Sequence, residues 1–138
     1  MDIKFDFTID GDPVAWKRPQ YSGRSRKFYT HEKVRAWQTH ISSQAHANME
    51  WGTIPEVPTK SALELNMDFY MKRPKSLPGK VTHHTKRPDA ENLGKAVADA
   101  LEDILYYNDS QVVKQSVSKQ YGEEPGVHIW GVIREGET

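Results

Sequence analysis

The sequence predicts an α+β protein of two layers, in which two helices pack on one mixed sheet. Three observations predict this class. Four segments have the residue pattern of strands, two segments carry apolar residues at helical spacing, and their order is β-α-β-α-β-β. The chain has 138 residues, a length that suits one ordinary hydrophobic core, so we expect a single domain over residues 1–138.

The first predicted element is a strand at residues 4–10, where Phe5, Phe7 and Ile9 alternate with polar neighbours. Alternation of this kind is typical of a strand that buries one of its two faces. Residues 11–19 follow as a basic stretch rich in turn-forming residues. We therefore expect the chain to turn directly after its first strand.

A helix and a second strand come next, followed by a loop. Residues 31 to about 49 carry apolar residues at spacings of three and four, which predicts a helix with one buried face. Residues 62–71 alternate again and predict a strand. Residues 73–87 contain two prolines, one glycine and no clean period, so we expect a mobile basic loop there. Pro88 favours an extended Arg87 and ends this loop.

The strongest helix signal in the chain lies within residues 90–104. Apolar residues recur there at i, i+3, i+4, i+7, i+8 and i+11, which predicts a helix of about fifteen residues with one apolar stripe. Gly94 inside this helix indicates a close approach by another element, such as a partner helix. Residues 111–119 and 127–133 predict two further strands joined by a turn. The stripe consists of Leu93, Ala96, Val97, Ala100, Leu101 and Ile104.

Charge is segregated along the chain although the formal net charge is zero. Residues 14–40 contain seven Lys and Arg and one Asp or Glu, and residues 60–87 contain seven Lys and Arg and two Asp and Glu. Residues 88–138 contain four Lys and Arg and ten Asp and Glu. Two basic segments that could bind a polyanion therefore precede an acidic one, although runs of charge are also typical of a solvated surface.

The composition excludes several classes of protein. The chain contains no cysteine, which rules out disulfides, thiolate metal sites and cysteine nucleophiles. No apolar run approaches the roughly 18 residues that a membrane span needs, and the acidic, polar start does not resemble a signal peptide. We therefore expect a soluble, cytoplasmic protein with no membrane partner.

Three carboxylates are candidates for chemistry at the strongest predicted helix. Asp89 and Glu91 lie at the expected start of this helix, where an acidic side chain can simply cap the backbone. Asp109 lies just before the next strand, which can return beside the start of the helix. Three carboxylates in one pocket would repel one another unless a cation lay among them.

The stretch 88–111 resembles the signature of the RusA family of Holliday junction resolvases. That signature reads Pro-Asp-x-Asp-Asn-Leu-x-Lys, then Asp-Ala-Leu, then Asp-Asp-x-Gln. The matching residues are Pro88, Asp89, Asn92, Leu93, Lys95, Asp99, Ala100, Leu101, Asp109 and Gln111. Outside the signature, the matching residues are Gly11, Pro13, Val14, Lys17, Arg18, Pro19, Arg73, Pro74, Lys75, Ser76 and Lys119. The resemblance covers nearly the whole chain.

The chain departs from the family pattern at two positions. Glu91 stands where the family usually has a second aspartate, which keeps the charge and lengthens the side chain by one methylene. Asn108 stands where the first of two paired aspartates is usual, and Asp109 keeps the second carboxylate.

The resemblance implies a homodimeric, magnesium-dependent endonuclease that makes paired cuts across a four-way DNA junction in recombination and repair, with Mn²⁺ as a possible substitute for Mg²⁺. It implies that Asp89, Glu91 and Asp109 are the metal ligands and that these residues and Lys95 are catalytic. Carboxylate oxygens suit Mg²⁺, and a lysine can stabilise charge that develops on phosphate oxygens. The residues expected to bind nucleic acid are Lys17, Arg18, Lys72, Arg73, Lys75, Lys86 and Arg87.

Two other functions remain open on the sequence alone. The chain could bind branched DNA without cutting it, for which Glu91 is the one hint in the sequence. It could also be an interaction domain whose carboxylates only cap a helix. Magnesium-dependent cleavage separates the nuclease from both alternatives. Salt-sensitive DNA binding separates the protein that only binds branched DNA from the interaction domain.

Overall fold

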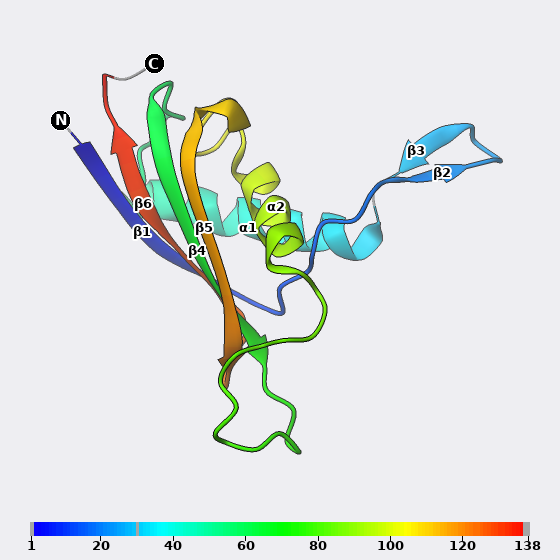
Figure 1. The fold of residues 1–138 in the computed structure, drawn as a ribbon. Coiled ribbons are helices and arrows are strands. Elements are labelled where there is room, and N and C mark those ends of the chain that lie inside the picture. Colours follow the sequence, from blue (N-terminus) through cyan, green and yellow to red (C-terminus); the bar gives the residue numbers. More distant parts are fainter. Residues whose placement is uncertain (1, 30, 137–138) are drawn as a thin grey trace.

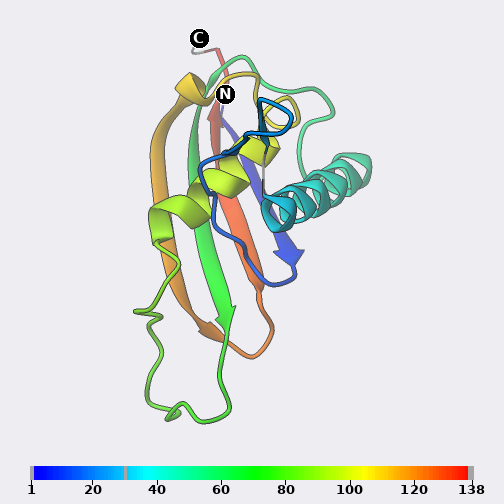
Figure 2. The same cartoon turned by 90° about the vertical axis from the view of Figure 1, so that its right-hand side faces the viewer.

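The computed structural model describes residues 2–29 and 31–136. Its elements are β1 (Asp2–Asp10), β2 (Gln20–Ser22), β3 (Lys27–Tyr29), α1 (Glu32–Trp51), β4 (Ala62–Lys72), α2 (Ala90–Leu101), the short 3-10 helix η1 (Asp109–Gln111), β5 (Val112–Gly122) and β6 (Gly126–Arg134). Four strands form a sheet in the order β1-β6-β4-β5, in which β4 and β5 are parallel and the other neighbours antiparallel. The helices α1 and α2 lie on one face of this sheet (Figures 1 and 2). The predicted α+β class, with two helices on one mixed sheet, is confirmed.

The core lies between the sheet and the two helices, and the predicted patterns account for it. The alternating residues Phe5, Phe7 and Ile9 of β1 are buried, as are the alternating apolar residues of β4. Each helix buries its apolar stripe against this layer, since Trp37 of α1 and Leu93 of α2 belong to the same cluster. The predicted periods therefore identify the faces that meet in the core.

The helix α2 is shorter than predicted, because it ends at Leu101 after 12 residues. Its C-cap residue Glu102 is extended, and Asp103 has a left-handed backbone with φ of 69°. A left-handed residue with a side chain cannot continue an α-helix. Ile104, the last member of the predicted stripe, is still buried, but it reaches the core from the turn that follows the helix.

Gly94 lets α2 lie close to the sheet, so the predicted close approach is found, and the approaching elements within the chain are β4 and β5. A Cβ atom at this position would lie 2.7 Å from Cγ2 of Val117 on β5 and 3.3 Å from Cε of Met67 on β4. Carbon atoms do not approach to 2.7 Å without a shift in the structure. The glycine therefore fixes how closely the start of α2 packs on the strands beneath it.

Two segments connect these layers. Residues 73–87 contain no helix and no strand, in line with the predicted loop. They pair with β5 through an isolated bridge between His83 and Gln120 and through the backbone N–H of Arg73, which donates to the carbonyl oxygen of Gly122 at 3.3 Å. The mobility of this loop remains a prediction. The hairpin of β2 and β3 was not predicted, because each strand has only three residues and shows no period. Among the described residues, no helix is both long and apolar enough to cross a membrane.

Candidate active site

The start of α2 is anchored to β5 by a lysine. The Nζ atom of Lys119 donates to the carbonyl oxygen of Lys86 at 2.6 Å and to that of Pro88 at 2.7 Å. The Arg87–Pro88 peptide bond is cis. These two hydrogen bonds fix the backbone that leads directly into Asp89.

A second segment joins the start of α2 from the other side. The backbone N–H of Trp16 donates to the carbonyl oxygen of Asn92 at 2.8 Å. The ammonium group of Lys95 lies over the Trp16 ring, 4.8 Å from its centroid, which is close enough for a cation–π interaction. The basic segment that follows β1 is therefore tied to α2 by both backbone and side chain.

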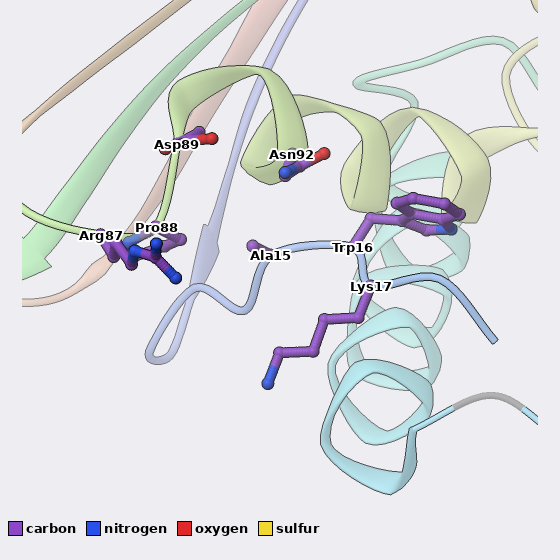
Figure 3. A pocket seen from close by; sticks show the side chains of 7 residues that line it. All are labelled: Ala15, Trp16, Lys17, Arg87, Pro88, Asp89 and Asn92. Atoms are coloured by element: carbon purple, nitrogen blue, oxygen red, sulfur yellow. The ribbon is translucent and has the colours of Figure 1, made fainter. Parts of the chain in front are cut away.

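An open pocket of about 570 Å³ lies where these two segments meet (Figure 3). Its lining combines two cations, Lys17 and Arg87, with the carboxylate of Asp89 and the amide of Asn92. Cations and a carboxylate around one open space provide both a place for a phosphate and an oxygen ligand for a metal ion. The complete lining is Ala15, Trp16, Lys17, Arg87, Pro88, Asp89 and Asn92.

Asp89 occupies the N-cap position of α2 but does not cap the helix with its side chain. Its backbone is extended, with φ of −70° and ψ of 144°, and its side chain is exposed. Glu91 is also exposed and lies in the first turn. Since the carboxylate of Asp89 is not used by the helix backbone, simple capping does not explain this residue.

Asp109 lies at the opposite end of α2 from Asp89. Its backbone N–H donates to Oε1 of Glu102, the C-cap residue of α2, at 3.2 Å. The strand β5 then runs back past the helix, and Lys119, which contacts Pro88, lies seven residues beyond Val112. At about 3.3 Å per residue, this part of the strand spans about 23 Å.

The three predicted metal ligands are therefore not brought together within one chain. In the part of the chain that the structure describes, no three His, Asp or Glu residues form a group that could hold a metal ion. The expectation that the turn after α2 returns Asp109 to the start of the helix is wrong, because β5 begins beside the end of α2 and a later residue reaches the start. The role of all three carboxylates as ligands remains a prediction.

An acidic group surrounds Asp109 at the end of α2. Partial burial raises the pKa of Asp99; the charge of Asp109 raises it further, whereas Lys95 lowers it. Burial also raises the pKa of Tyr106, with Glu102, Asp99 and Asp109 adding to the effect, and its hydroxyl donates to the carbonyl oxygen of Ala98 at 2.5 Å. The carboxylate of Asp99 thus interacts with the charges of both Lys95 and Asp109, and it lies on the exposed side of α2.

The predicted DNA-binding cations fall into two groups. Among the described residues, none of these seven cations forms an ion pair. Lys17 and Arg87 line the pocket, with Arg18 and Lys86 adjacent in the chain and exposed. The second group, Lys72, Arg73 and Lys75, lies at the other end of the loop and does not line the pocket.

Arg73 differs from the other six because its guanidinium group is used within the protein. Its Nη1 atom donates to the carbonyl oxygen of Pro78 at 3.0 Å, and Nη2 donates to that of Val81. The group also lies over the Tyr121 ring, 5.7 Å from its centroid. Arg73 therefore shapes the basic loop, while the exposed Lys72 and Lys75 beside it face solvent.

Sequence reasoning gave no site role to Lys119 or Asn92. Their contacts depend on segments that are distant in the chain, since Lys119 is 31 residues from Pro88 and Asn92 meets Trp16 through its backbone. One signal could have identified Lys119. It is the single charged residue on the face of its predicted strand that packs toward the helix, where its neighbours are uncharged.

The chain is similar to a known protein family and to a bacterial protein. The family model described as "Endodeoxyribonuclease RusA" matches residues 10–130. A protein of Bacillus subtilis (strain 168), named "Uncharacterized protein YqaN", is 32% identical over 141 residues. The aligned region covers 94% of this chain and 94% of that protein.

Proposed function

Because this chain belongs to the RusA endodeoxyribonuclease family, we propose that it is a magnesium-dependent endonuclease that resolves four-way DNA junctions by paired cuts. The observation that carries the proposal is the pocket at the start of α2. The carboxylate of Asp89, which does not cap the helix, lines this pocket together with Lys17 and Arg87. A nuclease needs both functions in one place: cations that hold the phosphate, and oxygen ligands for the ion.

The carboxylates at the start of α2, one of which lines the pocket, fit Mg²⁺. Proteins usually bind this ion through one or two carboxylates, with water and substrate phosphate completing its octahedral shell. Asp89 and Glu91 supply two exposed carboxylates at the start of α2, and the DNA would supply the phosphate. Bound Mg²⁺ would polarise the scissile phosphate and promote attack by water.

Three cations have roles that do not depend on the ion: two line the pocket, and Lys95 lies beside the pocket residue Trp16. Lys17 and Arg87 hold and orient the DNA backbone. Lys95, one helical turn beyond Glu91, stabilises the charge that grows on the phosphate oxygens in the transition state. Its ammonium group is held over the Trp16 ring, which restricts its position without neutralising its charge.

A homodimer is part of this proposal. Two cuts on opposite strands need two active sites, and a symmetric pair of chains supplies them. In an isologous pair, the end of one α2 can also lie beside the start of the other, so that Asp109 of one chain reaches the ion bound by its partner. This arrangement would reconcile the role predicted for Asp109 with its distance from Asp89 within one chain.

A branched-DNA-binding protein without cutting activity is the second candidate. The observation that favours it is the absence, among the described residues of one chain, of any three acidic or histidine side chains that could hold an ion. Both candidates place the DNA against Lys17, Arg18, Lys86 and Arg87. A protein with DNA as its substrate or ligand also fits the cytoplasm that the sequence predicts.

One experiment separates the two candidates. A four-way junction and a linear duplex of the same sequence are incubated with the protein, with and without Mg²⁺ or Mn²⁺. The nuclease gives paired nicks in the junction only when the metal is present. Binding to the junction without any metal-dependent nick would leave the binding protein as the function.

A further inference from the structure

The hairpin of β2 and β3, together with its turn, forms an arm of residues 20–29 that stands apart from the main sheet. The two strands pair only with each other, from Gln20 opposite Tyr29 to Ser22 opposite Lys27. Figure 1 shows this arm extending away from the sheet, on the side where α1 and α2 lie. Of the arm residues whose side chains the structure describes, 21–26, none belongs to the core between the layers.

The tip of the arm has a defined backbone. The N–H of Arg26 donates to the carbonyl oxygen of Ser22 at 2.8 Å, and the N–H of Ser25 lies 3.4 Å from the Ser22 hydroxyl oxygen. Arg26 is left-handed, with φ of 53°. Glycine adopts this conformation at lower cost, so the fold alone would favour glycine at this position.

The charge of the arm has one sign. Residues 14–31 contain five Lys and Arg and no acid. Arg24 and Arg26 at the tip are exposed, and neither takes part in any ion pair among the described residues. An exposed, unneutralised pair of arginines on a narrow hairpin is suited to a polyanion.

The arm continues directly from the candidate active site. Trp16 is held to Asn92 by its backbone, Lys17 lines the pocket, and only Arg18 and Pro19 separate Lys17 from the first strand of the arm. The base of the arm therefore lies three residues along the chain from the pocket, so a duplex that extends from the pocket in this direction would pass the arm. The major groove of B-DNA is about 12 Å wide and admits a two-stranded β-ribbon.

From these observations, we propose that the arm is a second DNA-binding element, which lies along a groove of the duplex next to the cut site. Arg24 and Arg26 contact phosphates of that duplex, on the far side from Lys17 and Arg87. This inference rests on the proposed function, since it takes its ligand to be the DNA held at the pocket. It adds two contacts that are neither among the seven predicted DNA-binding cations nor in the pocket.

Three variants test the arm: Arg24→Ala, Arg26→Gly and the double variant. Lys4→Ala is the matched control, because Lys4 is an exposed cation on β1, in the main sheet and outside both the arm and the pocket. The measurement is junction affinity as a function of salt concentration, without metal. Each lost phosphate contact makes the slope of log affinity against log salt shallower by about 0.9, so the double variant should differ from wild type by about 1.8.

Arg26→Gly separates binding from folding. It removes a charge and also relieves a left-handed backbone, so this variant should melt at or above the temperature of the wild type while it binds DNA more weakly. A double variant with the slope of the wild type would overturn the arm's role. Equal losses in Arg24→Ala and in Lys4→Ala, which each remove one positive charge, would also overturn it, because the effect would then belong to net charge.

The proposed nuclease and the arm fail in different ways. If the wild type cuts the junction and the double variant has the same slope of log affinity against log salt as the wild type, the nuclease stands and the arm does not. If the wild type binds without cutting and this slope is shallower in the double variant, the arm stands and the nuclease does not. A wild type that binds no DNA would overturn both.

Discussion

The ammonium group of Lys119 lies 2.7 Å from the carbonyl oxygen of Pro88, the residue immediately before Asp89. A second carbonyl, that of Lys86, lies 2.6 Å from the same group. Through this contact, a strand that lies far from the candidate site in sequence sets the position of the backbone at the start of α2. Several consequences can be measured.

Replacing Lys119 by methionine should destabilise the protein and reduce cleavage. Methionine keeps the length of the side chain but cannot donate, and a hydrogen bond from a charged group contributes about 1.5–3 kcal/mol. We expect the free energy of unfolding in urea to fall by about this amount, because Lys119 is half-buried. Lys114→Met on the same strand is the control, since Lys114 is exposed and has only a 3.9 Å contact with Glu64. Equal losses in the two variants would show that the Lys119 contacts do not matter.

The contact between Lys95 and Trp16 predicts that an aromatic ring is needed at position 16. Trp16→Leu should slow cleavage because it removes the face on which the ammonium group rests, whereas Trp16→Phe keeps such a face and should retain most of the rate. The cation–π contact itself contributes on the order of 0.5–1 kcal/mol of stability. Trp16 is half-buried and packs against the core, so melting temperatures of both variants are measured beside their rates. Rates at saturating DNA separate this effect from binding. Similar rates in both variants would mean that Trp16 does not position Lys95.

Much of the fold could be predicted from the sequence, because its elements are periodic and long. Phe5, Phe7 and Ile9 are buried as their alternation requires, and Leu93 lies on the buried stripe of α2 as its spacing requires. The β2 and β3 strands were missed because three residues contain too little of a period. Local pattern therefore identified every strand and α-helix of the main body, but neither η1 nor any part of the arm.

The candidate site was predicted in its residue types but not in its geometry. The end of α2 depends on the left-handed Asp103, and the direction of β5 decides that Lys119 and not Asp109 returns to the start of the helix. Neither feature produces a period or a motif. The distance between Asp89 and Asp109 could be learned only from the path of the chain in space.

Asp99 should make stability depend on pH in a direction opposite to that of an ordinary surface aspartate. Its pKa in the folded protein is raised above the ordinary value of 3.8 by burial and by Asp109. The folded state then binds the proton more tightly than the unfolded state, so this residue lowers stability as the pH rises from 3.8 through the raised pKa. Asp99→Asn should flatten this part of the profile and be more stable than wild type at pH 7. Urea unfolding at several pH values tests this, and an unchanged profile would contradict it.

Glu91 should affect the concentration of metal that the reaction needs. Glu91→Gln replaces a carboxylate by a much poorer ligand and should raise the Mg²⁺ concentration for half-maximal cleavage, whereas Glu91→Asp keeps the charge and should remain active. If Glu91 only interacts with the helix dipole, the glutamine variant should instead lose about 0.3–1 kcal/mol of stability and keep the metal dependence of the wild type. Metal titrations alongside melting temperatures distinguish these two results.

The most direct test of the proposed nuclease concerns Asp89, whose carboxylate lies in the pocket and does not cap α2. Cleavage and gel-shift affinity are measured on one four-way junction for Asp89→Asn and for Asp12→Asn, an exposed aspartate outside the pocket. We expect Asp89→Asn to abolish magnesium-dependent cutting and to bind the junction as tightly as wild type or more tightly, because a negative charge near the phosphate is removed. Asp12→Asn should cut normally. Cutting by Asp89→Asn at the rate of the wild type would contradict the assignment of the active site to the start of α2.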